Sequence, residues 1–138
     1  MSHIRLLALV YGVGFLFIAV MGYIPPFVDD QGYLFGLFAL DMYDNLLHAV
    51  SGIWALIAGF VSAQQTIRYF KIFGTLYFLD GVIGLLFGNA YLDFGIFLYG
   101  IADNTFALNF MLNIPHIIIG GVAVLAGFYL SKKAIFIA

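Results

Sequence analysis

Apolar residues dominate four long stretches of the chain, and short polar segments separate them. The first stretch, residues 6–24, carries no charge and ends at Pro25-Pro26, which cannot continue a helix. A helix needs about 20 apolar residues to cross the hydrocarbon core of a bilayer. The pattern therefore predicts one transmembrane domain, residues 1–138, folded as an all-α bundle of four membrane-spanning helices. We expect helices at about 6–24, 45–63, 69–88 and 113–131, with outer loops at 25–44 and 89–112.

Small and polar residues recur at intervals of three and four in the second and fourth predicted helices, so they fall on one face of each. The two sets are Asn45, His48, Gly52, Ala55 and Gly59, and Asn113, His116, Gly120, Ala123 and Gly127. Small residues let membrane helices approach closely where lipid provides no hydrophobic force for association. We therefore expect both faces to form helix–helix contacts.

The third predicted helix carries glycines at the same intervals. Its small-residue face consists of Gly74, Gly81, Gly84 and Gly88, with Tyr77 among them. Because so many positions on this face permit close approach, we expect this helix to lie centrally in the bundle.

The sequence also suggests an internal repeat. Phe35-Gly36-Leu37-Phe38 in the first outer loop matches Phe94-Gly95-Ile96-Phe97 in the second, and Tyr11 corresponds to Tyr77. Together with the repeated faces described above, this pattern predicts a tandem duplication of a helix pair. Since each pair crosses the membrane twice, the two copies would share one orientation.

Composition and charge fix the environment of the chain. It is 64% hydrophobic and only 9% charged, whereas soluble domains carry roughly 25% charged residues. Lipid must therefore cover most of the surface. The basic residues fall at helix ends that four crossings place on one side: Arg5, Arg68, Lys71, Lys132 and Lys133. The positive-inside rule then predicts cytoplasmic termini in a multi-pass protein of the bacterial inner membrane. So few basic residues exclude a nucleic-acid partner.

Several motifs resemble those of a known family. They are Asp44-Asn45-Leu46-Leu47-His48 with Gly52 after it, Phe35-Gly36-Leu37-Phe38 before it, and Ala102-Asp103-Asn104 in the last loop. With them the chain resembles a group of small bacterial four-helix membrane proteins catalogued as domain of unknown function 4383. The resemblance spans most of the chain and implies a topology but no activity. In the family the second Asp-Asn leads almost directly into a histidine, whereas here Asn113 takes the position near His116.

Three ionisable residues fall within the predicted membrane helices, where such groups are costly and raise a functional question. His48 and His116 occupy equivalent positions near the outer ends of their helices. They could bind one haem b, a chlorin or a metal, with Asn45 and Asn113 fixing the ring tautomers. Alternatively, each histidine is neutral and hydrogen-bonded at the membrane interface, and the asparagines cap helices.

Asp80 is the third residue, and it lies deeper in its helix, near the glycine face. It could belong to a proton relay or an ion site with one of the histidines. The alternative is a protonated carboxyl group hydrogen-bonded to Tyr11, Tyr77 or a backbone carbonyl. No nucleophile is accompanied by a base and an acid in the sequence, so we do not expect an enzyme.

Three functions remain. The first is an accessory or scaffold subunit of a larger membrane assembly, with other membrane chains or copies of itself as partners. The second is an electron-transfer protein in which His48 and His116 are axial ligands of a haem. The third is a proton-coupled carrier that uses Asp80.

Overall fold

The computed structural model describes residues 1–131, so Lys132 and Lys133 lie outside the described part. The long helices are α1 (His3–Met21), α2 (Met42–Val61), α3 (Ala63–Phe87) and α5 (Phe106–Leu125), the last continued by η2 (Ala126–Leu130). Short helices η1 (Pro25–Phe27) and α4 (Gly95–Tyr99) lie in the connecting segments. All four long helices are long and apolar enough to cross a membrane. The predicted all-α, four-span membrane fold is therefore confirmed.

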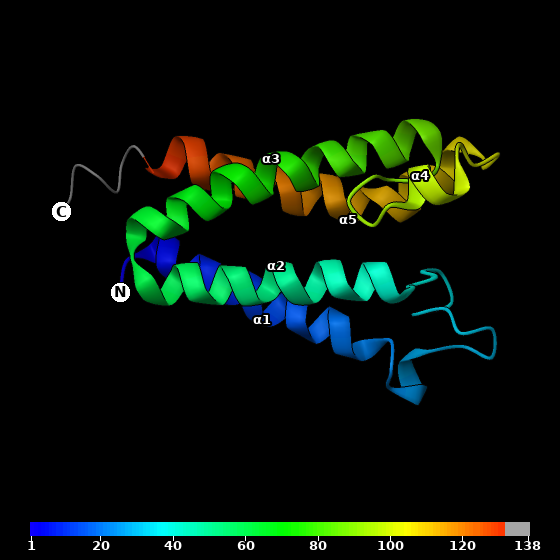
Figure 1. The fold of residues 1–138 in the computed structure, drawn as a ribbon, viewed down its shortest axis with the longest axis horizontal. Helices are drawn as coiled ribbons and strands as arrows, with labels where there is room; N and C mark the ends of the chain where they lie inside the picture. The colour runs from blue at the N-terminus through cyan, green and yellow to red at the C-terminus, as the bar shows by residue number, and fades with distance from the viewer. Residues whose placement is uncertain (132–138) are drawn as a thin grey trace.

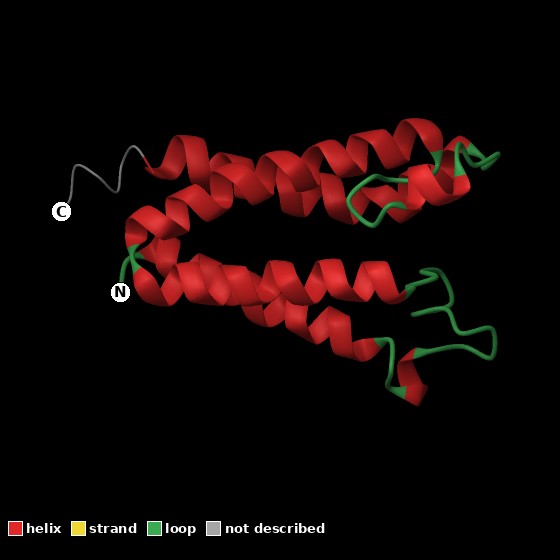
Figure 2. Ribbon diagram, in the orientation of Figure 1, coloured by secondary structure: helices red, strands yellow, loops and turns green. Residues whose placement is uncertain are grey.

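The long helices form two hairpins, α1 with α2 and α3 with α5 (Figure 1). Contacts are concentrated within each hairpin and are sparser between them. Figure 2 shows the longer loops gathered at one end of the bundle. We call this the loop end, and the opposite end, where α1 begins and η2 ends, the terminal end.

The connection between α2 and α3 is shorter than the sequence suggested. We expected one helix to end near residue 63 and the next to begin near residue 69, but only Ser62 separates the two helices. The Ser62 hydroxyl accepts a hydrogen bond from the Gln65 backbone N–H, which caps the start of α3. The Thr66 hydroxyl donates to the carbonyl of Ala58, so polar side chains stabilise the helix start instead of breaking it.

The start of the last helix was also predicted wrongly. We expected it near Asn113, with Pro115 in its first turn, but α5 begins at Phe106 and contains Pro115 in its interior. The Thr105 hydroxyl supplies the cap by accepting from the Leu108 N–H. His116 consequently lies ten residues into α5, about 15 Å along its axis, and not near the helix end.

Small residues permit the close contacts within each hairpin. A Cβ added at Gly52 would lie 2.9 Å from the Gly12 carbonyl of α1, and one at Gly74 would lie 2.7 Å from the Val124 nitrogen of α5. A Cβ at Gly120 would collide with the Phe78 backbone. The other small residues of the predicted faces that lie in helix contacts are Ala55, Gly59, Gly81, Gly84, Ala123 and Gly127.

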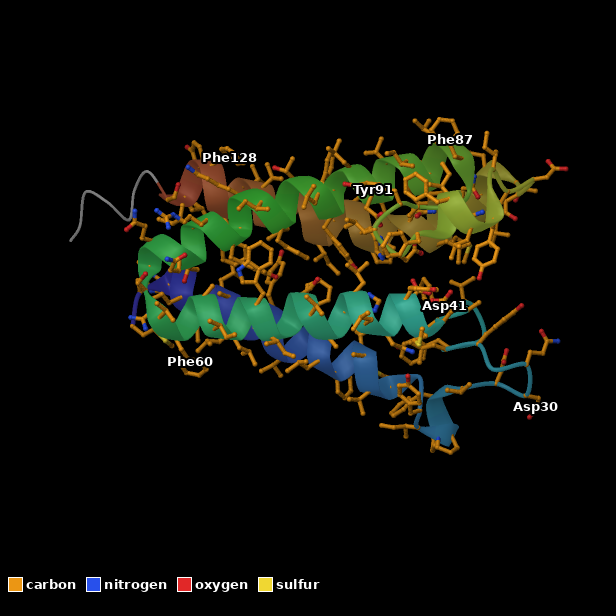
Figure 3. All side chains as sticks on the ribbon, in the orientation of Figure 1. Asp30, Asp41, Phe60, Phe87, Tyr91 and Phe128 are labelled. Carbon is orange, nitrogen blue, oxygen red and sulfur yellow. The ribbon has the colours of Figure 1, made fainter. Side chains whose placement is uncertain are left out.

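Gly88 differs from the other glycines of the predicted faces, because it ends α3 instead of packing in the middle of a helix pair. Its φ angle of +83° is in the left-handed region, which favours glycine. The outward faces of the helices are apolar, as Phe60 and Phe128 show in Figure 3. Contact of such faces with lipid costs no free energy, whereas their exposure to water would be unfavourable.

The α3–α5 contact provides a test of the packing. We expect Gly74→Ala to lower the free energy of unfolding by about 1–3 kcal/mol, since the added methyl group meets backbone atoms that cannot move aside. Gly14→Ala is the matched control, because no atom lies within 4 Å of a Cβ at Gly14. Unfolding of both variants in detergent measures the difference, and equal stabilities would contradict this packing.

Candidate functional site

A cavity of about 500 Å³ lies between the two hairpins at the loop end. Segments far apart in the sequence enclose it: α2, α5, the loop over residues 33–40 and the segment that follows α3. Its polar lining residues are Asp44, His48, Asn89, Asp93, Asn104, Asn113 and His116. The two histidines singled out in the sequence therefore line one cavity, each contributed by a different hairpin.

Asp80 lies beside this cavity on α3, with 1% of its surface exposed. Its Oδ1 accepts hydrogen bonds from the backbone N–H groups of Tyr91 (2.9 Å) and Leu92 (2.7 Å). Its Oδ2 lies 2.8 Å from Nδ1 of His116. Its hydrogen-bond partners are therefore two backbone N–H groups and an imidazole, and not Tyr11, Tyr77 or a backbone carbonyl, the partners expected for a protonated carboxyl group.

The donors to Asp80 come from a segment that re-enters the bundle. After Gly88 the chain folds back along α3 before α4 begins (Figure 2), and Figure 3 labels Tyr91 on this segment. The Tyr91 hydroxyl donates to the carbonyl of Leu76, which precedes Asp80 by one turn of α3 (2.8 Å). Burial, and then the charge of Asp80, raise the pKa of the Tyr91 hydroxyl. Irregular backbone at membrane depth requires such internal partners.

Aromatic rings join the two histidines at the inner boundary of the cavity. The ring of Tyr77 packs against His116, with 4.3 Å between centroids, and the Tyr77 hydroxyl lies 3.4 Å from Nε2 of His48. Phe15 stacks on His48 at 5.8 Å. The centroids of the two imidazoles are 6.4 Å apart, with the ring planes at 83°. Tyr77 thus contacts both histidines.

The two ring nitrogens of each histidine have different surroundings. Nδ1 of His116 is held by Asp80, and no described residue forms a hydrogen bond with its Nε2. The Asp44 carbonyl, one turn earlier on α2, interacts with the His48 ring, but Nδ1 of His48 forms no hydrogen bond of acceptable geometry. Each histidine therefore keeps one nitrogen without a hydrogen bond.

The asparagines lie close to the site but do not bind the histidines. The Asn45 amide donates to the Tyr23 hydroxyl (3.3 Å), and the Asn113 amide donates to the Asn109 carbonyl (2.9 Å). Neither residue caps its helix, since Asp41 and Thr105 do so. Asp80 orients His116 in the place we had expected for Asn113. Tyr11 instead links α1 to α5, because its hydroxyl donates to the Ile119 carbonyl (2.8 Å).

The sequence did not reveal the contributions of Tyr91, Leu92 and Asp93, all in the re-entrant segment. The available signal was Gly88 followed by the repeated Phe94-Gly95 pair, which marks irregular backbone; Phe94 has a positive φ of 66°. These residues do not show by themselves that the segment returns into the bundle.

The arrangement suits proton exchange at a fixed position. When Nδ1–H of His116 donates to the Asp80 carboxylate, Nε2 is left as an acceptor, and the carboxylate stabilises the ring if Nε2 takes up a proton. Among the described residues, no group of three or more His, Cys, Asp or Glu side chains could hold a metal ion.

Comparison with known proteins identifies a family without assigning an activity. A family model described as "Domain of unknown function (DUF4383)" matches residues 5–108. The match includes Asp44, His48, Asp80 and Asp93 and ends before His116. No curated protein and no solved structure matches the chain.

The hydrogen bonds of Asp80 predict a large effect of its removal. We expect Asp80→Ala to lower the free energy of unfolding by about 1–3 kcal/mol for each buried donor left unpaired, and to speed amide hydrogen exchange at Tyr91 and Leu92. Asp103→Ala, at an exposed position of the loop end, is the control and should change neither. Wild-type exchange rates in Asp80→Ala would show that the carboxylate does not hold the segment.

Proposed function

Because the chain belongs to the DUF4383 family, whose description names no activity, we propose a function from the geometry of the site. The protein is a multi-pass membrane protein that binds a small polar solute in the cavity at the loop end. The Asp80–His116 pair exchanges a proton as the solute binds. This proposal develops the third function considered from the sequence, a proton-coupled carrier that uses Asp80, with His116 as the partner of the acid.

The single observation that supports this proposal is the hydrogen bond between buried Asp80 and half-buried His116 beside a polar cavity. The sequence placed Asp80 deeper than the histidines, but its Oδ2 lies 2.8 Å from Nδ1 of His116, so the two side chains meet at one depth. A buried carboxylate costs free energy in a membrane and is commonly functional there. Proton exchange gives the pair a role that packing alone does not require.

The orientation in the membrane is part of the proposal. Arg5 and Arg68 lie in the helices at the terminal end. Of the seven aspartates, all except Asp80 lie at the loop end, either in the connecting segments or in the first turn of α2. The positive-inside rule therefore supports cytoplasmic termini in a bacterial inner membrane, with the cavity facing outward.

An accessory or scaffold role in a larger assembly explains less of this site. Such a role needs a surface for other membrane chains or for a second copy, and the exposed helix faces are mainly apolar, as lipid alone would require. It gives no reason for a buried acid beside a cavity. Stoichiometric co-purification of another chain from native membranes would support that role instead.

Proton exchange can be measured calorimetrically. We expect heats of solute binding to wild-type protein in nanodiscs to differ between phosphate and Tris buffers, whose ionisation enthalpies differ. Asp80→Asn keeps the side-chain shape but removes the charge, so its binding heat should be independent of the buffer. Asp103→Asn should behave as wild type does. A solute that binds wild-type protein with buffer-independent heat would contradict the proposal, as would an unchanged buffer dependence in Asp80→Asn.

A second candidate, haem binding in electron transfer, is favoured by one distance. When two imidazoles bind one metal ion with metal–nitrogen bonds of about 2.0–2.1 Å, their ring centroids lie about 6 Å apart. The centroids of the His48 and His116 rings are 6.4 Å apart. Against it, the Tyr77 hydroxyl is next to Nε2 of His48 and the Tyr77 ring covers His116. Tyr77 would have to move before an iron could bind between the imidazoles.

An absorption spectrum separates the two candidates. We expect the purified protein to lack a Soret band, because the Tyr77 hydroxyl is next to Nε2 of His48 and the Tyr77 ring packs against His116. A Soret band that disappears in both His48→Ala and His116→Ala would establish the haem protein and overturn this expectation. Spectra of protein grown with added haem precursor provide the control for limited supply.

A further inference from the structure

Two carboxylates, one from each hairpin, meet at the cavity. Asp44 lies in the first turn of α2 and Asp93 in the re-entrant segment, and their carboxyl groups interact directly. A backbone N–H group fixes each: Asp41 donates to Oδ2 of Asp44 (3.0 Å), and Gly95 donates to Oδ1 of Asp93 (2.9 Å). Apart from this contact between the two carboxyl groups, each receives a hydrogen bond only from that one backbone N–H group among the described residues. The two carboxyl groups are thus held in place side by side at the cavity.

No positive side chain compensates these charges. None of the described residues that line the cavity is lysine or arginine. Arg5 is at the terminal end, where its guanidinium donates to the Gly59 and Phe60 carbonyls. Two neighbouring carboxylates repel each other unless a proton or a cation lies between them. The cavity is therefore electronegative at its loop side.

His48 provides a second observation that points to a ligand. It lines the same cavity, only 5% of its surface is exposed, and its Nδ1 has no hydrogen bond within the described residues. A buried polar atom without a partner is costly and is explained when a bound molecule supplies one.

The size of the cavity selects among cations. Pockets for small molecules typically measure about 300–1,000 Å³, and this cavity measures about 500 Å³. A bare metal ion needs several ligands converging within a few ångströms, and the described residues contain no such group. Tyr33 and Phe38 also line the cavity, and aromatic rings favour organic cations.

We infer that the solute is a small organic cation whose ammonium group binds between the Asp44 and Asp93 carboxylates. This inference rests on the proposed solute-binding function. The ammonium group donates hydrogen bonds to oxygens of both carboxylates, which lie on different hairpins. The rest of the molecule extends toward His48 and the Asp80–His116 pair. Binding therefore joins the two hairpins across the cavity.

Three probes with the same carbon chain test the charge of the solute: putrescine, butanediol and succinate. We expect putrescine to bind the full-length protein in nanodiscs and to raise its Tm, while butanediol and succinate do not. Asp93→Asn keeps the acceptor for Gly95 and should weaken putrescine binding at least about tenfold, since it removes one of two charges in the site. Asp30→Asn, an exposed loop position outside the cavity, should bind as wild type does.

Asp44→Asn is a second variant, and circular dichroism confirms that each variant is folded. Binding of butanediol as strong as that of putrescine would overturn the inference, as would wild-type affinity in Asp93→Asn. Tighter binding of magnesium ions than of putrescine would also overturn it and indicate a metal site. Putrescine binding with buffer-independent heat would support the cation but contradict proton exchange. Binding of butanediol but not of putrescine, with a heat that depends on the buffer, would support proton exchange but contradict the organic cation.

Discussion

The burial of the Asp80 carboxyl group in a membrane bundle is the constraint on which the loop end of this protein depends. Water cannot solvate Asp80 there, so the protein must supply hydrogen-bond donors. Two are the backbone N–H groups of Tyr91 and Leu92, in the segment that returns along α3 after the helix ends. The third partner is the imidazole of His116 on α5. The same bonds satisfy backbone N–H groups that would be costly to leave unpaired in hydrocarbon. The acid and the re-entrant segment therefore stabilise each other.

Close helix approach is what lets His116 reach this acid. Gly81 follows Asp80 directly in α3, and a Cβ at Gly81 would lie 2.8 Å from the Ile117 nitrogen and 2.9 Å from Cβ of His116. Any larger residue would push α5 away from α3 and lengthen the hydrogen bond to Asp80. Glycine here serves the polar site as well as the packing. Stability and site geometry are consequently difficult to separate in this contact.

The interface between the hairpins is divided into two regions by the aromatic face of α3. On the terminal side, Tyr69, Phe73 and Tyr77 stack along α3 with centroids 5.0 and 4.9 Å apart. These rings fill the space between the hairpins, so the cavity lies on the loop side of Tyr77. The site includes residues of both hairpins and exists only when they are assembled. A small solute held between them would favour the assembled state, as any ligand of the folded form does.

The sequence by itself determined the four apolar helices, the small-residue faces and the three ionisable residues within the helices, because hydropathy and helical spacing are local properties of the chain. It placed His48 and His116 on helix faces with small residues, but it put His116 near a helix end, since Asn113 and Pro115 look like a helix start. Only the tertiary structure decided that Thr105 caps α5, that His116 meets Asp80, and that Asp44 and Asp93 face each other. These pairings depend on how the hairpins pack and on a segment that re-enters the bundle. The spacing of residues within one helix does not encode the distance between that helix and another segment of the chain.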